Sequence, residues 1–432
     1  MNIFYRYKNI HFSDIEAIRD IQETQLGKHI SYCRKNSPFY RRMLDDADFD
    51  SKHFTMENLA DLPFTERSFL ELNEDEFCAV PSDKIIDIAL SSGVTGNRPV
   101  MYIYSDYDLK RLAYNEKQSL SMCGVSTEDV VLLTCTIDQC FYAGLAHFLG
   151  IRDLGAKAIR SGNNNAQGIW EIIKKVPPTV IVGAPRYLKK LGDYMVEHGE
   201  DPGKTGVKKL ICIGEPIRDK YLKLLKIGSD LQDIWGAEIF SSYSSLEIGT
   251  TFCECSFRQG GHIPPDLAIV EIIDEKGIAL PPGVIGEVVV TPMAVKGMPL
   301  LRFKTGDISY VIDEPCLCER TSYRLGPILG RKEQMMNIHG TTLYPQKIYA
   351  ALDEIKAISD YFIVATSKNN LSDAVTVFAA VNEKSCTSDI IKNRLKAQLQ
   401  LTSEVVIGNE KAIREQIYTM NSATPVRFID RR

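Results

Sequence analysis

The stretch TVIVGAPRYLKKLGDYMVEHG, residues 179–199, decides the fold. Its first six residues, 179–184, form a short apolar, β-branched run, which is typical of a strand buried on both faces of a sheet. From Pro185 onward, apolar residues recur at helical spacing among charged ones, so we expect a helix over 185–199. A buried strand that leads directly into an amphipathic helix is part of a βαβ unit and predicts a parallel sheet.

The same alternation of short apolar runs and amphipathic segments continues on both sides of this stretch. A second amphipathic segment, DLKRLAYNEKQSL (108–120), is also expected to be helical. The apolar runs expected as further strands of the parallel sheet are IIDIALSS (85–92), VVLLTC (130–135), KLICIG (209–214) and EIFSSY (238–243). The middle of the chain is therefore predicted to be an α/β core with a largely parallel sheet.

Changes of pattern divide the chain into four parts. Residues 1–83 are predicted to be mostly helical, and residues 84–250 form the α/β core. Residues 251–331 carry short β-rich runs between Gly/Pro turns, which favours a smaller antiparallel sheet. Residues 332–432 return to strand–helix alternation, with a helix near 387–400, and predict a separate α+β domain. The fold class is therefore α/β: a large N-terminal body with a parallel α/β sheet and a smaller β-rich part, plus a small C-terminal domain.

The composition excludes several classes of protein. The 432 residues include 51 Lys and Arg against 56 Asp and Glu, a net charge of −5, whereas a nucleic-acid binder usually carries a basic stripe. No apolar run approaches the roughly 18 residues needed to cross a bilayer, and the N-terminus lacks the pattern of a signal peptide. The 11 cysteines point to reduced thiols or a metal rather than a disulfide scaffold. We therefore expect a cytoplasmic enzyme with neither a nucleic-acid nor a membrane partner.

A loop rich in glycines and hydroxyls follows the first expected strand of the core. Its residues are Ser91, Ser92, Gly93, Val94, Thr95, Gly96 and Asn97. Glycines let a backbone approach a polyphosphate closely, and amides and hydroxyls offer donors to its oxygens. The loop lacks the GxxxxGK[ST] spacing of a P-loop. It predicts a phosphate-binding site, with an ordinary polar turn as the alternative.

Two further motifs would complete a nucleotide site. Tyr243 and Glu247 follow a buried strand, where an aromatic ring can stack on a base and a carboxylate can hold a divalent metal. Asp307 follows a Thr-Gly turn and can accept hydrogen bonds from ribose hydroxyls, and Arg331 can share the sugar or a phosphate. The alternatives are a solvated loop acid at Glu247 and a charged hairpin around Asp307.

Taken together, these motifs resemble the adenylate-forming (acyl-activating) superfamily, and within it the phenylacetate–coenzyme A ligase-like branch. The resemblance covers almost the whole chain and keeps the family's order. The segments that carry it are SPFYRR (37–42), LADLPFTERSFL (59–70), SSGVTGNRP (91–99), Gly214-Glu215-Pro216, YSSLE (243–247), RFKTGD (302–307), GRKEQMMNIHGTTLYP (330–345) and VRFIDRR (426–432).

The resemblance implies two half-reactions. An acid attacks the α-phosphate of ATP to give acyl-AMP, and coenzyme A then displaces AMP to leave a thioester. Glu247 is expected to bind Mg²⁺ and, with Thr95, to act in catalysis. The positions that the resemblance assigns to the nucleotide are Ser91, Ser92, Gly93, Thr95, Gly96, Gly214, Glu215, Pro216, Tyr243, Ser244, Asp307 and Arg331. The family's C-terminal domain is mobile, Glu333 matches its hinge, and Gly340 matches the loop that enters the site for the second half-reaction.

The segment after the strand at 130–135 matches a family stretch that lines the acyl pocket. Phe141, Tyr142 and Gly144 are the substrate-binding candidates within it. Aromatic walls suit a flat aryl acid, so the expected substrate is phenylacetate-like. Simple packing of Phe141 and Tyr142 in the core is the alternative.

One departure from the family concerns a lysine near the C-terminus that bridges the carboxylate and the α-phosphate. Thr424 occupies that position, and the nearest lysine, Lys411, lies 13 residues upstream. Another cation, such as Lys304, Arg331 or Arg427, would then substitute for it. Alternatively, the protein receives a preformed adenylate or performs only the second half-reaction, or it is a degenerate relative.

The cysteines include two CxC pairs, Cys253 with Cys255 and Cys316 with Cys318, and His262 follows the first pair. Zinc takes four tetrahedral nitrogen and sulfur ligands. Members of the resembled branch carry a similar set, so we expect a structural zinc on Cys255, His262, Cys316 and Cys318, with Cys253 as the alternative first ligand. Free buried thiols are the alternative without metal.

The sequence therefore predicts an AMP-forming acid–thiol ligase. It would use ATP, Mg²⁺ and coenzyme A, hold a structural zinc, and act on a small-molecule carboxylic acid. One alternative is acyl loading onto the thiol of a carrier protein. The other is a catalytically impaired nucleotide- or acyl-binding relative, which the replacement at Thr424 favours. The sequence leaves the oligomeric state open, a homodimer included.

Overall fold

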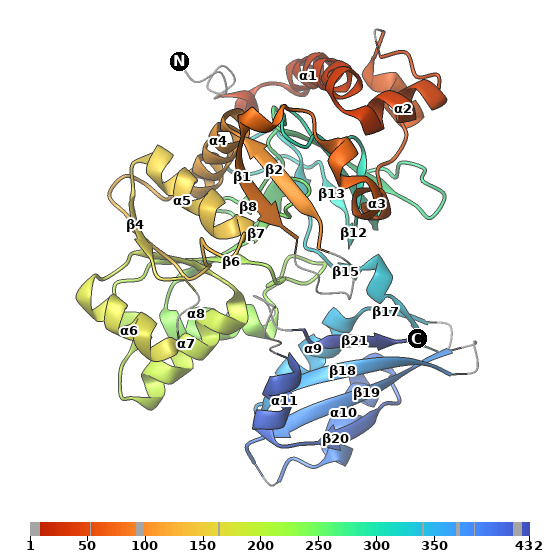
Figure 1. The fold of residues 1–432 in the computed structure, drawn as a ribbon. Helices are drawn as coiled ribbons and strands as arrows, with labels where there is room; N and C mark the ends of the chain where they lie inside the picture. Colours follow the sequence, from red (N-terminus) through yellow and green to blue (C-terminus); the bar gives the residue numbers. More distant parts are fainter. Residues whose placement is uncertain are drawn as a thin grey trace. The chain divides into compact units, whose positions relative to one another are not determined.

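The computed structural model describes residues 9–51, 53–91, 99–162, 165–338, 341–368, 372–383, 385–417 and 426–432. The chain forms two compact units, whose elements are labelled in Figure 1. Among the described residues, the first unit comprises 9–91, 99–305 and 309–328. The second unit comprises 306–308 and the described part of 329–432.

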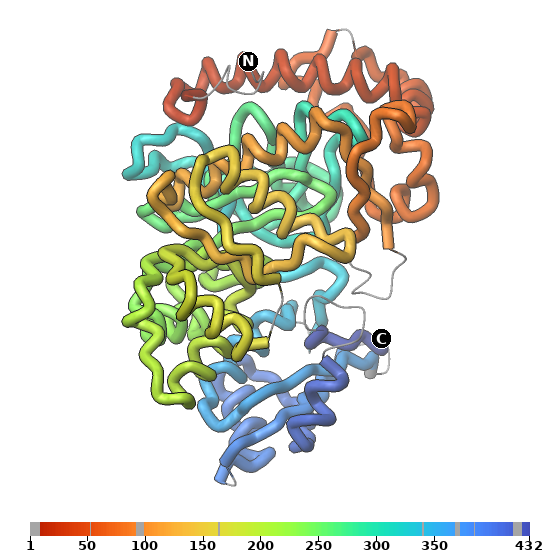
Figure 2. Tube along the Cα trace, turned by 60° about the vertical axis from the view of Figure 1, so that its left-hand side comes forward, coloured from red at the N-terminus to blue at the C-terminus, as the bar shows by residue number. Residues whose placement is uncertain are grey.

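The first unit begins with three helices, α1 (Ile15–Asn36), α2 (Pro38–Asp46) and α3 (Arg67–Phe77). Asp14 starts α1 by accepting a hydrogen bond from the Ala17 amide at 2.8 Å, which satisfies a donor of the first turn. Figure 2 shows α1 in red along one side of this unit. Phe39 of α2 and Phe77 of α3 stack with ring centroids 4.1 Å apart, in a core cluster that also contains Val288 and Leu301.

A sheet of nine strands forms the centre of the first unit as far as the structure describes it. Five strands run parallel, in the order β4 (Lys157–Arg160), β3 (Val130–Leu133), β5 (Val180–Gly183), β6 (Lys209–Ile213) and β7 (Glu238–Tyr243). Four short antiparallel strands continue it, namely β8 (Phe252–Glu254), β9 (Gly261–His262), β14 (Arg324–Leu325) and β13 (Val311–Ile312). The predicted α/β class with a parallel sheet is confirmed.

Helices cover both faces of the parallel strands, and alternate strand residues pack against each layer, as the two-residue period requires. Leu132, Ile181, Leu210 and Ile239 pack with α6 (Ala166–Lys175), α7 (Pro185–Glu197) and α8 (Lys226–Trp235). Val131, Val182, Ile211 and Phe240 pack with α4 (Asp106–Met122) and α5 (Tyr142–Leu154) on the opposite face. Figure 1 shows the two helix layers on either side of the strands.

The strand expected over 85–92 does not join the parallel sheet, so that expectation was wrong. β1 (Ile85–Leu90) pairs antiparallel with β2 (Met101–Ser105) in a sheet of its own. Ile86, Ile88 and Leu90 are exposed on β1, so its apolar run lacks the burial on both faces that a central parallel strand needs. The sequence also did not indicate β4, a short strand with a lysine and an arginine at its ends.

A second sheet of the first unit contains β10 (Ala268–Ile273), β11 (Gly286–Pro292) and β12 (Phe303–Ser309). Arg302, directly before β12, is 2% exposed and pairs with Glu271 of β10 at 2.8 Å. Its guanidinium also donates to the carbonyl oxygens of Ala60 and Leu62 at 2.8 and 2.6 Å. Arg302 therefore fastens the segment before α3 to this sheet through a fully compensated buried charge.

The second unit is an α+β domain. β18 (Ile358–Lys368) pairs antiparallel with β19 (Ser372–Val381), β20 (Glu404–Ile407) runs parallel to β19, and β21 (Phe428–Arg431) runs parallel to β18. α9 (Pro345–Asp353) and α10 (Ser388–Leu399) pack on one face, and α11 (Glu410–Ile417) packs on the other. The short hairpin of β16 (Met336–Ile338) and β17 (Thr341–Leu343) precedes them, and β15 (Gly330–Arg331) pairs with the end of β12.

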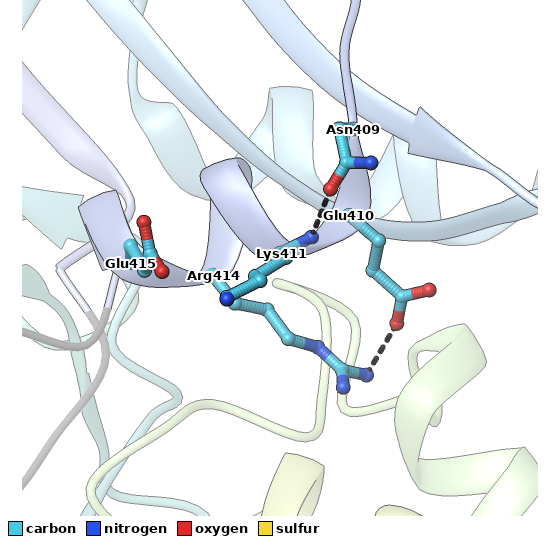
Figure 3. Close-up of a pocket in the computed structure, with 5 residues that line it drawn as sticks. All are labelled: Asn409, Glu410, Lys411, Arg414 and Glu415. Carbon is cyan, nitrogen blue, oxygen red and sulfur yellow. Dashed lines mark hydrogen bonds and ion pairs between the residues drawn. The ribbon is translucent and has the colours of Figure 1, made fainter.

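The start of α11 carries a group of polar side chains. Figure 3 shows Asn409, Glu410, Lys411, Arg414 and Glu415 lining a hollow there. Arg414 pairs with Glu410 at 2.7 Å, and the Asn409 side chain accepts a hydrogen bond from the Lys411 amide.

No described helix of either unit has both the length and the apolar character that crossing a bilayer would require.

We predict that Arg302→Ala lowers the stability of the first unit by about 3 to 5 kcal/mol, because the carboxylate of Glu271 is left buried without its partner. The matched control is Lys304→Ala, which removes an exposed pair with Glu66 and should cost less than about 1 kcal/mol. Thermal unfolding of the two variants beside the parent protein measures both effects. A melting temperature for Arg302→Ala no lower than that of Lys304→Ala would contradict this account.

Candidate functional site

Glu247, four residues beyond the end of β7, is held by an arginine from the N-terminal helices. The Arg67 guanidinium donates to Glu247 Oε1 at 2.8 Å and to Ser91 Oγ at 3.0 Å. It also donates from Nε to Glu71 Oε1 at 2.9 Å. The structure thus brings together the predicted metal-binding acid and the first serine of the predicted phosphate loop, although 156 positions separate them (247 − 91).

Two adjacent parallel strands end beside each other and carry the next group of candidates. Ile213 of β6 lies opposite Ser242 of β7, so Gly214 and Tyr243 leave the sheet at the same edge. Gly214 adopts a φ of +77°, which favours glycine and turns the chain after β6. Glu215 pairs with Arg186 of α7 at 3.0 Å. The carboxyl ends of parallel strands are the usual ligand-binding edge of such sheets.

The Tyr243 ring is half-buried, and its centroid lies 6.0 Å from that of Phe252 on β8. Ser244 and Pro216 lie in the loops that follow β7 and β6. An aromatic ring supported from below and partly open to solvent offers a face for stacking a base.

Asp307 and Arg331 meet where β15 pairs with residues 306–308 of β12, the part of that strand that belongs to the second unit. They lie opposite each other in the β12–β15 ladder, and Arg331 Nε is 3.2 Å from Asp307 Oδ1. The Asp307 side chain is 7% exposed and that of Arg331 is 54% exposed. The pair presents a buried carboxylate next to a guanidinium that solvent can reach. Glu333, the predicted hinge residue, follows in a short 3₁₀ turn, and Arg432 donates to its carbonyl oxygen at 3.2 Å.

Several predicted residues lie outside the described part of the chain. These are Ser92, Gly93, Thr95 and Gly96 of the predicted phosphate loop, Gly340 after the hinge, and Thr424 at the position of the missing lysine.

Buried tyrosines surround the predicted acyl-binding segment. Tyr142 at the start of α5 stacks on Tyr104 of β2, with centroids 6.1 Å apart and ring planes 20° from parallel. Among the described residues, the hydroxyls of Tyr102, Tyr104 and Tyr142 have no hydrogen-bond partner. A small cavity is bordered by Tyr102 and Tyr104 together with Leu246 and Glu247. Burial raises the pKa of Tyr102 and of Tyr104 well above the usual value, so both phenols are neutral at pH 7.

The other two residues of that segment differ in character. Phe141 is partly buried at the N-terminus of α5. Gly144 lies so close to the carbonyl oxygen of Thr136 that a Cβ atom would come within 1.8 Å of it. Its lack of a side chain therefore lets α5 approach the loop after β3.

Four soft ligands gather where β8, β9 and the loop at 316–318 meet. The ligand atoms of Cys255, His262, Cys316 and Cys318 all lie within 4.8 Å of one another. Cys255 Sγ is 3.6 Å from Cys316 Sγ, and Cys318 Sγ is 3.4 Å from His262 Nε2. Ligands of a tetrahedral zinc are about 3.8 Å apart when the Zn–S distance is about 2.3 Å. The donor set and its spacing therefore fit zinc.

The histidine of this group is held in a metal-binding orientation. Its Nδ1 lies 3.2 Å from Ser322 Oγ, which leaves Nε2 facing Cys318. Burial lowers the pKa of His262 to about 3, so the ring is neutral at pH 7. Cys253 lies apart from the group, because its thiol is 3.2 Å from that of Cys123 in the core under the sheet.

Two residues of these sites were missed by sequence reasoning. Ser322 carried no signal, because a serine in a loop is uninformative without its neighbours. Arg67 carried a weak one: it lies in the segment LADLPFTERSFL (59–70), where the resembled branch has a lysine in LPFTTKxxL. A basic residue 180 positions from Glu247 gave no sign that the two would meet.

Comparison with known proteins identifies relatives over nearly the full length. The AMP-binding enzyme family matches residues 18–296. A phenylacetate-coenzyme A ligase of Thermus thermophilus is 30% identical over 413 residues, covering 93% of this chain and 89% of the relative. A phenylacetate-coenzyme A ligase of Escherichia coli is 24% identical and covers 93% of both chains. A crystal structure of a 2-hydroxyisobutyryl-CoA ligase with 2-HIB-AMP has a TM-score of 0.86 at 21% identity, covering 98% of this chain and 91% of that one, and shares the fold.

Proposed function

The chain belongs to the AMP-binding enzyme family, in its phenylacetate–coenzyme A ligase-like branch, and on that premise we propose that it converts an aryl carboxylic acid to its coenzyme A thioester through an acyl-adenylate. The observation that carries the proposal is that Glu247 and Ser91 both contact the Arg67 guanidinium, at 2.8 and 3.0 Å. Both positions are ones that the resemblance assigns to the phosphates and their metal.

In the first half-reaction, a carboxylate oxygen of the acid attacks the α-phosphorus of ATP, and the bond from that phosphorus to pyrophosphate breaks. Glu247 would hold a Mg²⁺ ion, which neutralises phosphate charge. The Tyr243 ring would stack on the adenine and Asp307 would accept hydrogen bonds from the ribose, so that the α-phosphate is fixed in line with the acid. In the second half-reaction, the thiolate of coenzyme A attacks the acyl carbon and AMP leaves.

The proposed acid is aromatic. Tyr104 borders the same small cavity as Glu247, and Tyr142 stacks on the Tyr104 ring. Flat rings pack well against aromatic walls. The relatives named above that act on phenylacetate support the same class. Phe141 would complete the pocket from the N-terminus of α5.

We also propose that Cys255, His262, Cys316 and Cys318 hold a structural zinc. Four protein ligands leave no open position for a substrate or water, so the metal would have no part in the chemistry. It would instead join the turn after β8 to the loop at 316–318, where Cys255 and Cys316 pack with Met122 of α4.

Thr424 stands where the family has its adenylation lysine, and this replacement supports a second candidate function. In that case the protein would bind the nucleotide or the acyl group without catalysing the reaction. The experiment is a panel of aryl and aliphatic acids with ATP and Mg²⁺, assayed for pyrophosphate release with and without coenzyme A. Pyrophosphate and an aryl-CoA thioester are expected. Nucleotide binding without turnover of any acid would favour the binding protein, and acyl transfer to a phosphopantetheine carrier but not to coenzyme A would favour the carrier alternative.

We predict that Glu247→Gln and Asp307→Ala each lower the rate of acid-dependent pyrophosphate release by roughly a hundredfold or more, because each removes a charged contact to the nucleotide or its metal. The matched control is Glu238→Gln, since Glu238 lies at the opposite end of β7 in an exposed pair with Arg258. The circular dichroism of all three variants should match that of the parent. Normal turnover by either site variant would refute its assigned role.

We predict about one zinc per chain in protein purified without chelators, measured by elemental analysis. Cys255→Ala and Cys316→Ala should lose the metal, whereas Cys253→Ala should retain it because that thiol points to Cys123. A content under about 0.2 zinc per chain in the parent protein would discard the site, since structural zinc binds tightly.

A further inference from the structure

Arg67 occupies a position that the assigned chemistry leaves unexplained. Its guanidinium contacts Glu247, Ser91 and Glu71, with donor–acceptor distances of 2.8, 3.0 and 2.9 Å. The side chain is 27% exposed, so it is neither in the core nor freely solvated. A guanidinium has five N–H donors. Within the described part of the chain, three of them make these contacts, and the other two can bind a ligand.

The backbone before Arg67 is held firmly. Thr65, two residues earlier, is fully buried, and its amide donates to the carbonyl oxygen of Arg302 at 3.1 Å. The Thr65 hydroxyl lies 2.8 Å from the Tyr40 hydroxyl and donates to the carbonyl oxygen of Leu301 at 2.6 Å. Arg67 is the first residue of α3, directly after this fastened segment. A rigid attachment of this kind sets where a functional side chain points.

The Arg67 guanidinium faces two carboxylates, Glu71 and Glu247, so the three side chains carry a net charge of −1 (+1 − 2). An anionic ligand would therefore bind here together with a cation, the role proposed for Mg²⁺ on Glu247. Ser91 is a neutral hydroxyl, and it already accepts a hydrogen bond from the Val100 amide at 2.9 Å. A purely structural Arg67 would need only its two acidic partners. Its second terminal nitrogen, Nη2, instead donates to Ser91, the first residue of the predicted phosphate loop. Arginine's planar fork suits carboxylate and phosphate oxygens, and it keeps its charge at any relevant pH.

The other cations considered for the missing lysine also pair with carboxylates, in each case with acids other than Glu247. Arg427 is buried and pairs with Asp360 at 2.7 Å, so it serves the second unit's core. Lys304 pairs with Glu66 at 2.9 Å, and Arg331 pairs with Asp307. Within the first unit, Arg67 contacts both Glu247 and Ser91, the first residue of the 91–97 loop.

We propose that Arg67 is a catalytic residue of adenylation and supplies the positive charge that Thr424 does not. This inference rests on the proposed function. The carboxylate oxygen forms a bond to the α-phosphorus, the bond from phosphorus to the pyrophosphate oxygen breaks, and its electron pair leaves with pyrophosphate. No proton moves. Arg67 stays protonated, and its two remaining N–H groups bind the attacking carboxylate and an α-phosphate oxygen, where negative charge builds up.

The test separates the two half-reactions in Arg67→Ala and Arg67→Lys. Adenylation is followed as pyrophosphate release with hydroxylamine as the acyl acceptor, and thioester formation is followed from synthetic phenylacetyl-AMP and coenzyme A. We expect Arg67→Ala to slow adenylation by roughly a hundredfold or more at saturating Mg²⁺. Thioester formation should stay within about threefold of the parent, because no phosphorus–oxygen bond to pyrophosphate breaks in that step. Arg67→Lys should recover part of the lost rate, since it keeps the charge but not the fork.

The matched control is Arg42→Ala, which removes an exposed arginine of α2 that pairs with Glu76 of α3, the helix that also carries Arg67. It should leave both half-reactions unchanged, and all variants should share the parent's melting temperature within the spread of the control.

Three results would overturn the inference. The first is adenylation by Arg67→Ala as fast as by the parent, and the second is an equal loss of rate in both half-reactions. The third is full recovery of adenylation by Arg67→Ala when the Mg²⁺ concentration is raised, which would make Arg67 a positioning residue for Glu247. A parent protein that releases pyrophosphate with no acid would instead overturn the proposed function itself. An active parent with an equally active Arg67→Ala would overturn only the role of Arg67.

Discussion

The parallel register between β6 and β7 is the constraint on which the candidate site depends. Ile213 opposite Ser242 brings the two strand ends to one edge of the sheet, and the loops that leave this edge carry Gly214, Tyr243 and Glu247. Helix layers on both faces, packed on alternate residues of each strand, hold that register. Because both faces are covered, the edge at the strand ends is where the loops are free to carry polar groups for a ligand.

A single guanidinium then joins two parts of the first unit that are remote in sequence. Arg67 comes from the helical N-terminal part, and Glu247 and Ser91 come from the α/β core. Two carboxylates and a hydroxyl around one arginine carry a net charge of −1 (+1 − 2) before ligand binds. With the Mg²⁺ proposed on Glu247, Arg67 can bind a phosphate or carboxylate by exchanging partners rather than by moving the backbone. The Cys255–His262–Cys316–Cys318 group lies elsewhere in the same unit, and its closed set of ligands suits a structural role.

The sequence predicted the fold more fully than the site. Runs such as TVIVGA (179–184) and KLICIG (209–214) are apolar at both odd and even positions, which is typical of a strand covered on both faces. They form β5 and β6. IIDIALSS looks alike in composition but is half exposed, since burial depends on neighbours that a local pattern does not contain. Glu247 and Asp307 could be named because each stands in a recognisable motif. Arg67 could not, because its meaning comes from a contact across 180 positions. The choice between Cys253 and Cys255 likewise needed the position of Cys123.

The most direct test of a nucleotide site at this edge is a crystal structure of the protein with the sulfamoyl analogue of phenylacetyl-AMP, which is inert to both half-reactions. The account predicts adenine against the Tyr243 ring and the sulfamoyl group within hydrogen-bond distance of Arg67 and Ser91. An analogue bound away from Glu247, with the Arg67–Glu247 pair untouched by it, would contradict the account.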